Sequence, residues 1–275
     1  MLTMICVVVI AAVTLLLLYL FLIAPRIWGR QEMRSFYGYC YAHRGLYDND
    51  SKVPENSMTA FCKAVEAGYG IELDVQLSKD NIPVVFHDYE LKRMCGEVGK
   101  VSDYTYEELQ RFHLADTKEQ IPKLEAVLKM VAGRTPLIVE LKIGSTDLTV
   151  CSIVDELLSK YEGLYCIESF NPLGLWWYRR YRKNVVRGQL SNAFLREAEY
   201  DGVWYYFLQN LLVNFVGRPD FIAYNQKYPR MLSRRICCNL FGAVSVAWTI
   251  RSKEELESAK KNFDIYIFEG FHPCR

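Results

Sequence analysis

The hydrophobic positions of this chain follow two patterns, and the first is confined to the amino terminus. Residues 1–24 include no charged side chain and are mostly Val, Leu, Ile, Ala, Phe and Met. A helix of this length would span the roughly 30 Å core of a bilayer at about 1.5 Å per residue. A cleavable signal peptide is the alternative, but such peptides carry a basic region before a shorter apolar core. No basic residue precedes this run, which therefore predicts an uncleaved transmembrane helix.

The second pattern alternates short β-rich runs with longer amphipathic stretches. The strand candidates are 39–43, 70–77, 84–87, 137–141, 165–170, 185–190, 221–224, 244–248 and 265–268. The clearest helix candidates have apolar residues three and four apart, and they are 58–67, 121–131, 148–161 and 253–262. Strands that alternate with helices in this way indicate a parallel sheet in an α/β fold.

One pair of strands has a different connection. Only residues 78–83 join the second candidate to the third, which is too few for a parallel crossover and suits a hairpin. The remaining eight strands predict a (β/α)8 TIM barrel with a hairpin excursion after strand 2. A doubly wound open sheet is the alternative, although no Gly-x-Gly-x-x-Gly or Walker loop favours its nucleotide-binding form. We expect a transmembrane anchor at 1–24, a juxtamembrane linker at 25–38 and the barrel at 39–275.

Charge and cysteine content suggest where the large domain lies. Arg26, Arg30 and Arg34 follow the apolar run, so the positive-inside tendency places the domain on the cytoplasmic side of the membrane. The nine cysteines contain no C-x-x-C pair and are expected to be free thiols in a reducing compartment. A net charge of +1 gives no reason to expect a nucleic-acid partner.

Three carboxylates occur on two of the predicted strands. Glu72 and Asp74 lie two residues apart on one strand, so their side chains share a face at a spacing of about 6–7 Å. The opposite face is apolar and is expected to pack outward against helices: Ile71, Leu73, Val75 and Leu77. Glu140 supplies a third carboxylate, and three oxygen ligands suit Mg²⁺ or Ca²⁺ better than zinc. The alternatives are a solvent-facing acidic pair and a local Glu140–Lys142 ion pair.

Two histidines end apolar runs in the same part of the sequence. His43 follows Cys40-Tyr41-Ala42, and His87 follows Pro83-Val84-Val85-Phe86. Catalytic groups of parallel α/β folds lie at the carboxyl ends of strands, so this placement predicts an active site. A phosphodiester needs one group that removes a proton and another that protonates the leaving oxygen, and imidazole can do either near pH 7. Arg44 and Lys142 offer positive charge for phosphate oxygens. A structural role for each histidine is the alternative.

In these residues, the chain resembles the glycerophosphodiester phosphodiesterase family, within the phospholipase C-like phosphodiesterase barrels. The match rests on five motifs in order: His43-Arg44-Gly45, Glu55-Asn56-Ser57, Glu72-x-Asp74, His87-Asp88 and Glu140-Leu141-Lys142. Weaker similarity continues in 169–170 and 246–249, and the whole resemblance covers about residues 39–270. Together the ordered motifs are highly specific, although none would be so alone.

The resemblance implies roles for the acidic and imidazole groups. Glu72, Asp74 and Glu140 would hold one divalent cation, Mg²⁺ or Ca²⁺. His43 and His87 would be the general base and the general acid. The family cleaves sn-glycerol 3-phosphodiesters to glycerol 3-phosphate and an alcohol. The expected function is therefore metal-dependent hydrolysis of glycerophosphocholine or glycerophosphoethanolamine, with lysophospholipids as a further candidate because of the anchor.

The same resemblance implies substrate contacts. Arg44 and Lys142 would bind the phosphate, and Phe170 and Trp248 would line the glycerol pocket. Glu55 would support the cation or orient the general base. One departure is visible: the family ends its last strand with a Thr-Asp pair, where this chain has 267–273, Ile-Phe-Glu-Gly-Phe-His-Pro. A sphingomyelinase D-like lipid phosphodiesterase and a catalytically silent membrane-bound binding module are the alternatives.

A final apolar segment lies outside these motifs. Residues 203–215 are rich in aromatic side chains but too short to span a bilayer. An outer barrel helix with an apolar face would explain them. Membrane contact beside the active site is the alternative, and it would suit a lipid-derived substrate.

Overall fold

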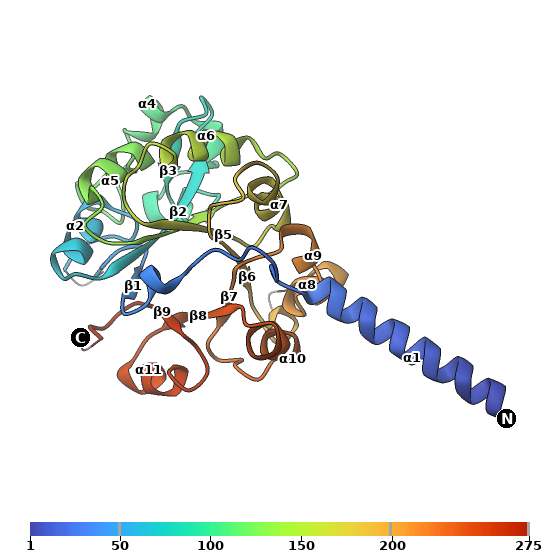
Figure 1. Ribbon diagram of the computed structural model, residues 1–275. Helices are drawn as coiled ribbons and strands as arrows, with labels where there is room; N and C mark the ends of the chain where they lie inside the picture. Colours follow the sequence, from blue (N-terminus) through green and yellow to red (C-terminus); the bar gives the residue numbers. More distant parts are fainter. Residues whose placement is uncertain (49–50, 198–199, 274–275) are drawn as a thin grey trace.

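The computed structural model describes residues 1–48, 51–197 and 200–273, and in this part of the chain nine strands form one sheet. The strands are β1 (Cys40–His43), β2 (Gly70–Leu77), β3 (Pro83–Val85), β4 (Leu137–Leu141), β5 (Tyr165–Ser169), β6 (Arg187–Ser191), β7 (Phe221–Asn225), β8 (Val244–Ile250) and β9 (Ile265–Phe268). Eight of them pair in parallel, and β1 pairs with both β2 and β9, which closes the barrel. β3 pairs antiparallel with β2. The predicted TIM barrel with a hairpin excursion is confirmed (Figure 1).

The excursion strand ends earlier than the sequence predicts. β3 stops at Val85, so His87 lies in the loop that follows and not in a strand reaching residue 87. Beyond Val85, the Phe86 N–H still donates to the Asp74 carbonyl oxygen at 3.0 Å. Gln76 Nε2 donates to the carbonyl oxygens of Phe86 and Asp88, at 2.8 Å each, and these bonds hold the loop that carries His87 against β2.

Helices cover the outside of the barrel (Figure 1). The longer ones are α2 (Met58–Glu66), α5 (Leu124–Val131), α6 (Thr149–Leu158), α7 (Pro172–Tyr181), α8 (Val203–Gln209) and α11 (Lys253–Ala259). The shorter ones are α3 (Lys92–Cys95), α4 (Tyr106–Leu109), α9 (Asn214–Gly217) and α10 (Leu232–Arg235). Polar caps start several of them: Ser57 accepts from the Ala60 N–H and Ser252 from the Glu255 N–H. The four helices predicted from periodicity all form, each somewhat shorter than predicted.

Strand alternation separates two apolar layers. Ile71, Leu73 and Val75 face outward and pack with the helices in the larger core, as predicted. A second cluster fills the barrel interior, with Tyr41, Ile138, Cys166, Phe221 and Ile265 among its buried members. Because side chains alternate along a strand, Glu72 and Asp74 of β2 therefore point into the barrel.

Residues 25–38, expected to be a juxtamembrane linker, lie against the amino-terminal end of the barrel. Met33 and Phe36 are buried in the interior cluster, and the hydroxyl of Tyr41 donates to the Phe36 carbonyl oxygen at 3.0 Å. Arg30 Nη2 donates to the carbonyl oxygen of Phe241, 2.7 Å away. This segment therefore closes the end of the barrel opposite the strand carboxyl ends.

Phe36→Ala is expected to lower the free energy of unfolding by about 3–5 kcal/mol, because it removes a buried ring and leaves a cavity. Tyr37→Ala is the matched control, since Tyr37 is exposed next to it. Urea unfolding of the full chain in detergent, followed by tryptophan fluorescence, measures both. Equal losses in the two variants would show that the segment contributes no core packing.

The amino-terminal helix, α1 (Leu2–Ile23), projects from the barrel (Figure 1). It is long and apolar enough to cross a membrane, a property that it shares with signal sequences. Side chains 2–18 are exposed, whereas Ile23 is buried and the Phe21 ring lies 6.3 Å from that of Phe215. Only the last turns of α1 therefore contact the domain.

The aromatic segment 203–215 forms two short helices, α8 and α9, and not one outer helix. The chain turns at Leu211, which has a φ of 56°. Leu208 and Val213 are buried, but Trp204 and Tyr206 are each about half exposed. The segment thus has the apolar inner face of the first interpretation together with exposed aromatic rings.

Candidate active site

Three carboxylates converge at the carboxyl end of the barrel. Glu72 and Asp74 come from β2 and Glu140 from β4, and strand register places Asp74 directly beside Glu140. One oxygen from each of the three lies within 4.8 Å of the others, and all three residues are buried. The predicted convergence is confirmed, and the cluster could hold one divalent cation.

The charges within this cluster are only partly balanced. Burial raises the pKa of Glu72 and of Glu140, and the charge of Asp74 adds to both shifts. Burial would also raise the pKa of Asp74, but Lys142, His87 and Arg44 hold it below its ordinary value. Additional positive charge at this cluster would therefore stabilise the ionised carboxylates.

A fourth carboxylate, Glu168 on β5, lies next to Glu140 in strand register. Burial, followed by the charges of Glu140 and Asp74, raises its pKa well above the ordinary value. Glu168 Oε2 is buried and accepts no hydrogen bond from the described residues, and Asp74 Oδ1 has only the Lys142 ammonium, 3.3 Å away, as a partner. Buried carboxylate oxygens of this kind are the ligands that Mg²⁺ or Ca²⁺ prefers, so these residues fit such a cation.

Two cations border the carboxylates. Lys142 Nζ lies 2.9 Å from Glu140 Oε1 and 3.3 Å from Asp74 Oδ1, so the expected local ion pair exists and extends to a second strand. Arg44 Nη1 donates to Glu55 Oε1 at 2.7 Å, and its Nε lies 3.6 Å from Asp74 Oδ2. Both residues predicted to bind phosphate therefore lie at the carboxylate cluster.

His43 ends β1 with its ring between two acids. Its Nδ1 lies 2.5 Å from Glu269 Oε2, and its Nε2 lies 3.9 Å from Glu72 Oε2. Burial and the charge of Arg44 lower the pKa of His43, although Glu269 opposes them. Burial would raise the pKa of Glu269, but the hydrogen bond with His43 lowers it to about 2. An ionised Glu269 accepts a hydrogen bond from Nδ1–H and leaves Nε2 free to face the carboxylates.

His87 lies across the cluster, in the loop after β3. Its Nδ1 is 2.5 Å from Asp88 Oδ1, and the ring is close enough to Asp74 and Glu140 to influence the pKa of both carboxyls. Arg93 of α3 contacts Asp88 Oδ2 at 2.6 Å and Glu55 Oε1 at 2.6 Å. A continuous set of ion pairs therefore connects His87 to Glu55, which holds Arg44.

The motif at 55–57 performs three separate tasks. Glu55 contacts Arg44 and Arg93. The family resemblance suggests that Glu55 could orient His43, but the carboxylate that contacts His43 is Glu269. Asn56, with a φ of 54°, donates from Nδ2 to Asp74 Oδ2 at 2.9 Å. Ser57 caps α2. Three consecutive residues thus bind Arg44, bind Asp74 and cap the start of α2.

The structure requires glycine at position 45, the last residue of the motif His43-Arg44-Gly45. Its φ is +81°, and a Cβ at this position would lie 2.9 Å from Ala60 Cβ. Only glycine allows the chain to turn there, directly after His43 and Arg44, while α2 packs close to β1.

The two aromatic residues expected around the glycerol contact one another. The rings of Phe170 and Trp248 are 5.7 Å apart and nearly perpendicular, and Trp248 Nε1 is buried without a hydrogen-bond partner among the described residues. Phe170 lines a cavity of about 280 Å³ together with Glu140 and Lys142. Tyr200, Tyr205 and Leu208 form its aromatic and apolar side, and Trp248 does not line it.

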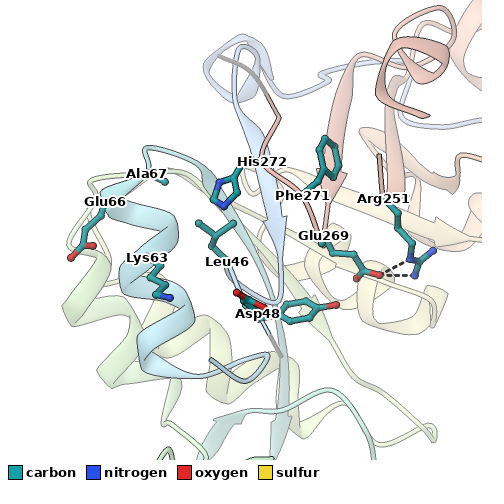
Figure 2. Close-up of a pocket in the computed structure, with 11 residues that line it drawn as sticks. Leu46, Asp48, Lys63, Glu66, Ala67, Arg251, Glu269, Phe271 and His272 are labelled. Carbon is teal, nitrogen blue, oxygen red and sulfur yellow. Dashed lines mark hydrogen bonds and ion pairs between the residues drawn. The ribbon is translucent and has the colours of Figure 1, made fainter. Parts of the chain in front are cut away.

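A larger cavity, of about 820 Å³, lies on the other side of Glu269 (Figure 2). Lys63, Glu66 and Arg251 are among its polar lining residues, whereas the carboxylate cluster is not part of its wall. Figure 2 shows the ion pair from Glu269 to Arg251, which the structure places at 2.7 Å from Oε1. Glu269 therefore holds His43 with one oxygen and this cavity's arginine with the other.

Sequence reasoning omitted two acids of this site. Glu168 was detectable, because it follows an apolar run two residues after inward-facing Cys166, as Glu140 follows Ile138. Glu269 was visible only as a departure from the family's Thr-Asp pair. Its contact with His43 depends on the pairing of β9 with β1, and no local pattern carries that information.

Comparison with known proteins agrees with this geometry. The model of the Glycerophosphoryl diester phosphodiesterase family matches residues 43–264. A glycerophosphodiester phosphodiesterase of Bacillus altitudinis is 43% identical over 129 residues, which are 44% of this chain and 51% of that protein. This chain thus spans about half the length of that relative. One from Caldanaerobacter subterraneus subsp. tengcongensis is 30% identical over 230 residues, 78% of this chain and 87% of that protein.

A solved structure shares the fold. An Oleispira antarctica phosphodiesterase in complex with the product sn-glycerol-3-phosphate aligns with a TM-score of 0.69 and 22% identity. The alignment covers 86% of this chain and 95% of that one. Because the family match extends over most of the barrel and includes both histidines and all three carboxylates, this chain belongs to the glycerophosphoryl diester phosphodiesterase family.

Proposed function

We propose that this chain hydrolyses glycerophosphodiesters to sn-glycerol 3-phosphate and an alcohol, with one divalent cation, Mg²⁺ or Ca²⁺. The observation that carries the proposal is the convergence of Glu72, Asp74 and Glu140, with His43 Nε2 facing the same cluster. Family membership and the product named for the Oleispira antarctica structure support the substrate class. A bound cation would neutralise negative charge on the phosphate oxygens.

Two histidines divide the proton transfers. Neutral His43 removes the proton from the substrate's own 2-hydroxyl, which attacks phosphorus and forms a cyclic phosphate. His87 gives a proton to the departing alcohol oxygen, and water then opens the ring. Glu269 supports this assignment, because its contact with Nδ1 leaves Nε2 as the free base. Asp88 orients the second imidazole in the same way.

The remaining residues position the substrate. Arg44, held by Glu55, and Lys142 present positive charge to the phosphate. Phe170 and Trp248 line the glycerol side. The cavity of about 280 Å³ beside Lys142, with tyrosine, leucine and Glu140 side chains in its wall, would take the alcohol portion. Glycerophosphocholine, glycerophosphoethanolamine and lysophospholipids are the substrates to compare.

The test uses the full chain in detergent, because residues 25–38 pack on the barrel. Incubation with glycerophosphocholine and Mg²⁺ or Ca²⁺ should release sn-glycerol 3-phosphate, identified by phosphorus NMR. A cyclic phosphate as the final product would instead favour the sphingomyelinase D-like reaction. No product from any of the three substrates would favour the silent binding module.

We also propose that α1 is a membrane anchor with the barrel at the cytoplasmic face. Its apolar length and exposed side chains support the anchor, and Arg26, Arg30 and Arg34 support the orientation. Retention in the membrane fraction after a carbonate wash would test the anchor. Protection of the barrel from added protease in sealed cells would test the orientation.

Glu269→Gln is expected to lower kcat by about 10–100-fold with little change in KM, because it removes the carboxylate that fixes the His43 ring. Glu269→Asp should not restore full activity, since the shorter side chain does not reach Nδ1. Glu257→Gln is the control, as an exposed glutamate paired only with Lys260 among the described residues. Steady-state kinetics on glycerophosphocholine measures all three. Unchanged kcat in Glu269→Gln would contradict the positioning role.

A further inference from the structure

We propose that a cavity at the base of α1 binds the headgroup of an anionic phospholipid. The cavity has a volume of about 650 Å³ and lies where the last turn of α1 meets the barrel. Five basic side chains line it: Arg26, Arg179, Lys183, Arg187 and Arg218. They come from the segment after α1, the end of α7, the start of β6 and the turn before β7. The cavity is thus at the amino-terminal end of the barrel, opposite the carboxylate cluster.

Positive charge in this cavity exceeds the available acid. Only Arg26 and Arg187 form ion pairs within the described part of the chain, both with Asp220, at 3.5 and 3.9 Å. Arg187 is 2% exposed, and its Nη1, the atom 3.9 Å from Asp220 Oδ2, makes no hydrogen bond with the described residues. Burial, with the charges of Arg26 and Arg179, lowers the pKa of Arg187 to about 10 although Asp220 opposes the shift. One carboxylate shared by two of the five cations leaves net positive charge on this wall of the cavity, which favours an anion.

The other wall of the cavity is apolar. Phe21, Trp28 and Phe241 contribute to it, and Trp28 is 87% exposed. Arg218 connects the two walls: its Nη1 donates to the carbonyl oxygens of Phe21 and Ala24, at 2.9 and 2.7 Å, and its guanidinium lies over the Phe21 ring. Cations therefore surround the carboxyl end of α1, at the level where its exposed apolar surface begins.

This combination favours a lipid over a free phosphate. An inorganic anion would use the basic wall alone, whereas a phospholipid places its phosphate among the cations and its acyl chains along the exposed side of α1. Tryptophan next to basic residues is also typical of the membrane interface. Basic pockets beside membrane helices bind anionic headgroups on the cytoplasmic side. The inference rests on the proposed anchoring by α1, and it assigns this lipid a site separate from the hydrolysed substrate.

Lys183→Glu tests the site with little risk to folding, because Lys183 is exposed. Arg180→Glu is the matched control, a charge reversal at an exposed arginine of α7 that does not line the cavity. The full chain in non-ionic detergent is titrated with phosphatidylserine or phosphatidylcholine, and bound lipid is counted by native mass spectrometry. A further titration adds inorganic phosphate to the phosphatidylserine complex.

Wild type and Arg180→Glu should each bind one phosphatidylserine, and Lys183→Glu should bind it about 30-fold more weakly. Phosphatidylcholine should bind at least about 10-fold more weakly than phosphatidylserine, and millimolar phosphate should not displace the lipid. Equal affinities in the two variants, or for the two lipids, would overturn the proposal. Displacement by phosphate would reassign the cavity to a free anion. Glycerophosphocholine hydrolysis should be the same in both variants, which separates this site from the proposed enzymatic function.

Discussion

Replacing His43 with alanine is expected to reduce kcat/KM for glycerophosphocholine by a factor of about 10²–10⁴, the usual contribution of general acid–base catalysis. The reason is geometric. Glu269 occupies Nδ1, so the other ring nitrogen is the group that faces the carboxylate cluster. Burial keeps the pKa of His43 below its ordinary value, which leaves the ring neutral and able to accept a proton.

The matched control for this substitution is His113→Ala. His113 is exposed and lies outside the site, so its loss should leave kcat/KM unchanged. Circular dichroism of both variants checks that the barrel is intact. Activity of His43→Ala within about threefold of wild type, in a folded protein, would reject the assignment of His43 as the base.

Removing divalent cations is the second change with a large expected effect. Chelation should abolish turnover, and readdition of Mg²⁺ or Ca²⁺ should restore it. Asp74→Asn should weaken cation binding by more than about 100-fold, because it removes a full negative charge from the centre of the cluster. Asp74 is the suitable target, since it contacts Asn56, Lys142 and Arg44 and has Glu140 as its strand neighbour.

Calorimetric titration of the chelator-treated chain measures this binding directly, without reference to activity. Glu125→Gln on the exposed side of α5 is the control and should bind the cation as wild type does. Absence of cation binding in the wild-type chain would contradict the metal site and favour a silent binding module. Equal affinity in Asp74→Asn would show that the ion binds elsewhere.

Much of the fold could be predicted because periodicity is a local signal. Alternation in β2 separates Glu72 and Asp74 from the outward residues Ile71 and Leu73, and this phase identifies the inward carboxylates without coordinates. The short connection to β3 likewise specifies a hairpin. The helix ends were less accurate: the amphipathic pattern begins three residues before α5 and continues three residues past the ends of α6 and α11.

What could not be predicted depends on contacts between distant parts of the chain. Glu269 meets His43 only because the barrel closes between β9 and β1, 226 residues apart in sequence. Residues 25–38 are predicted to be a linker because they lie between the apolar run and the first strand candidate. Met33 and Phe36 are buried because they pack against residues of the barrel interior, which come from other parts of the chain.

Lys142 gives the acidic cluster an internal counter-ion. Its ammonium group lies within 3.3 Å of oxygens on both Asp74 and Glu140, and partial neutralisation of this kind makes buried carboxylates tolerable during folding. Binding of a cation here would therefore be an exchange, in which the incoming ion competes with this tethered monovalent charge. Sodium or potassium has no electrostatic advantage in that exchange, whereas a doubly charged ion does.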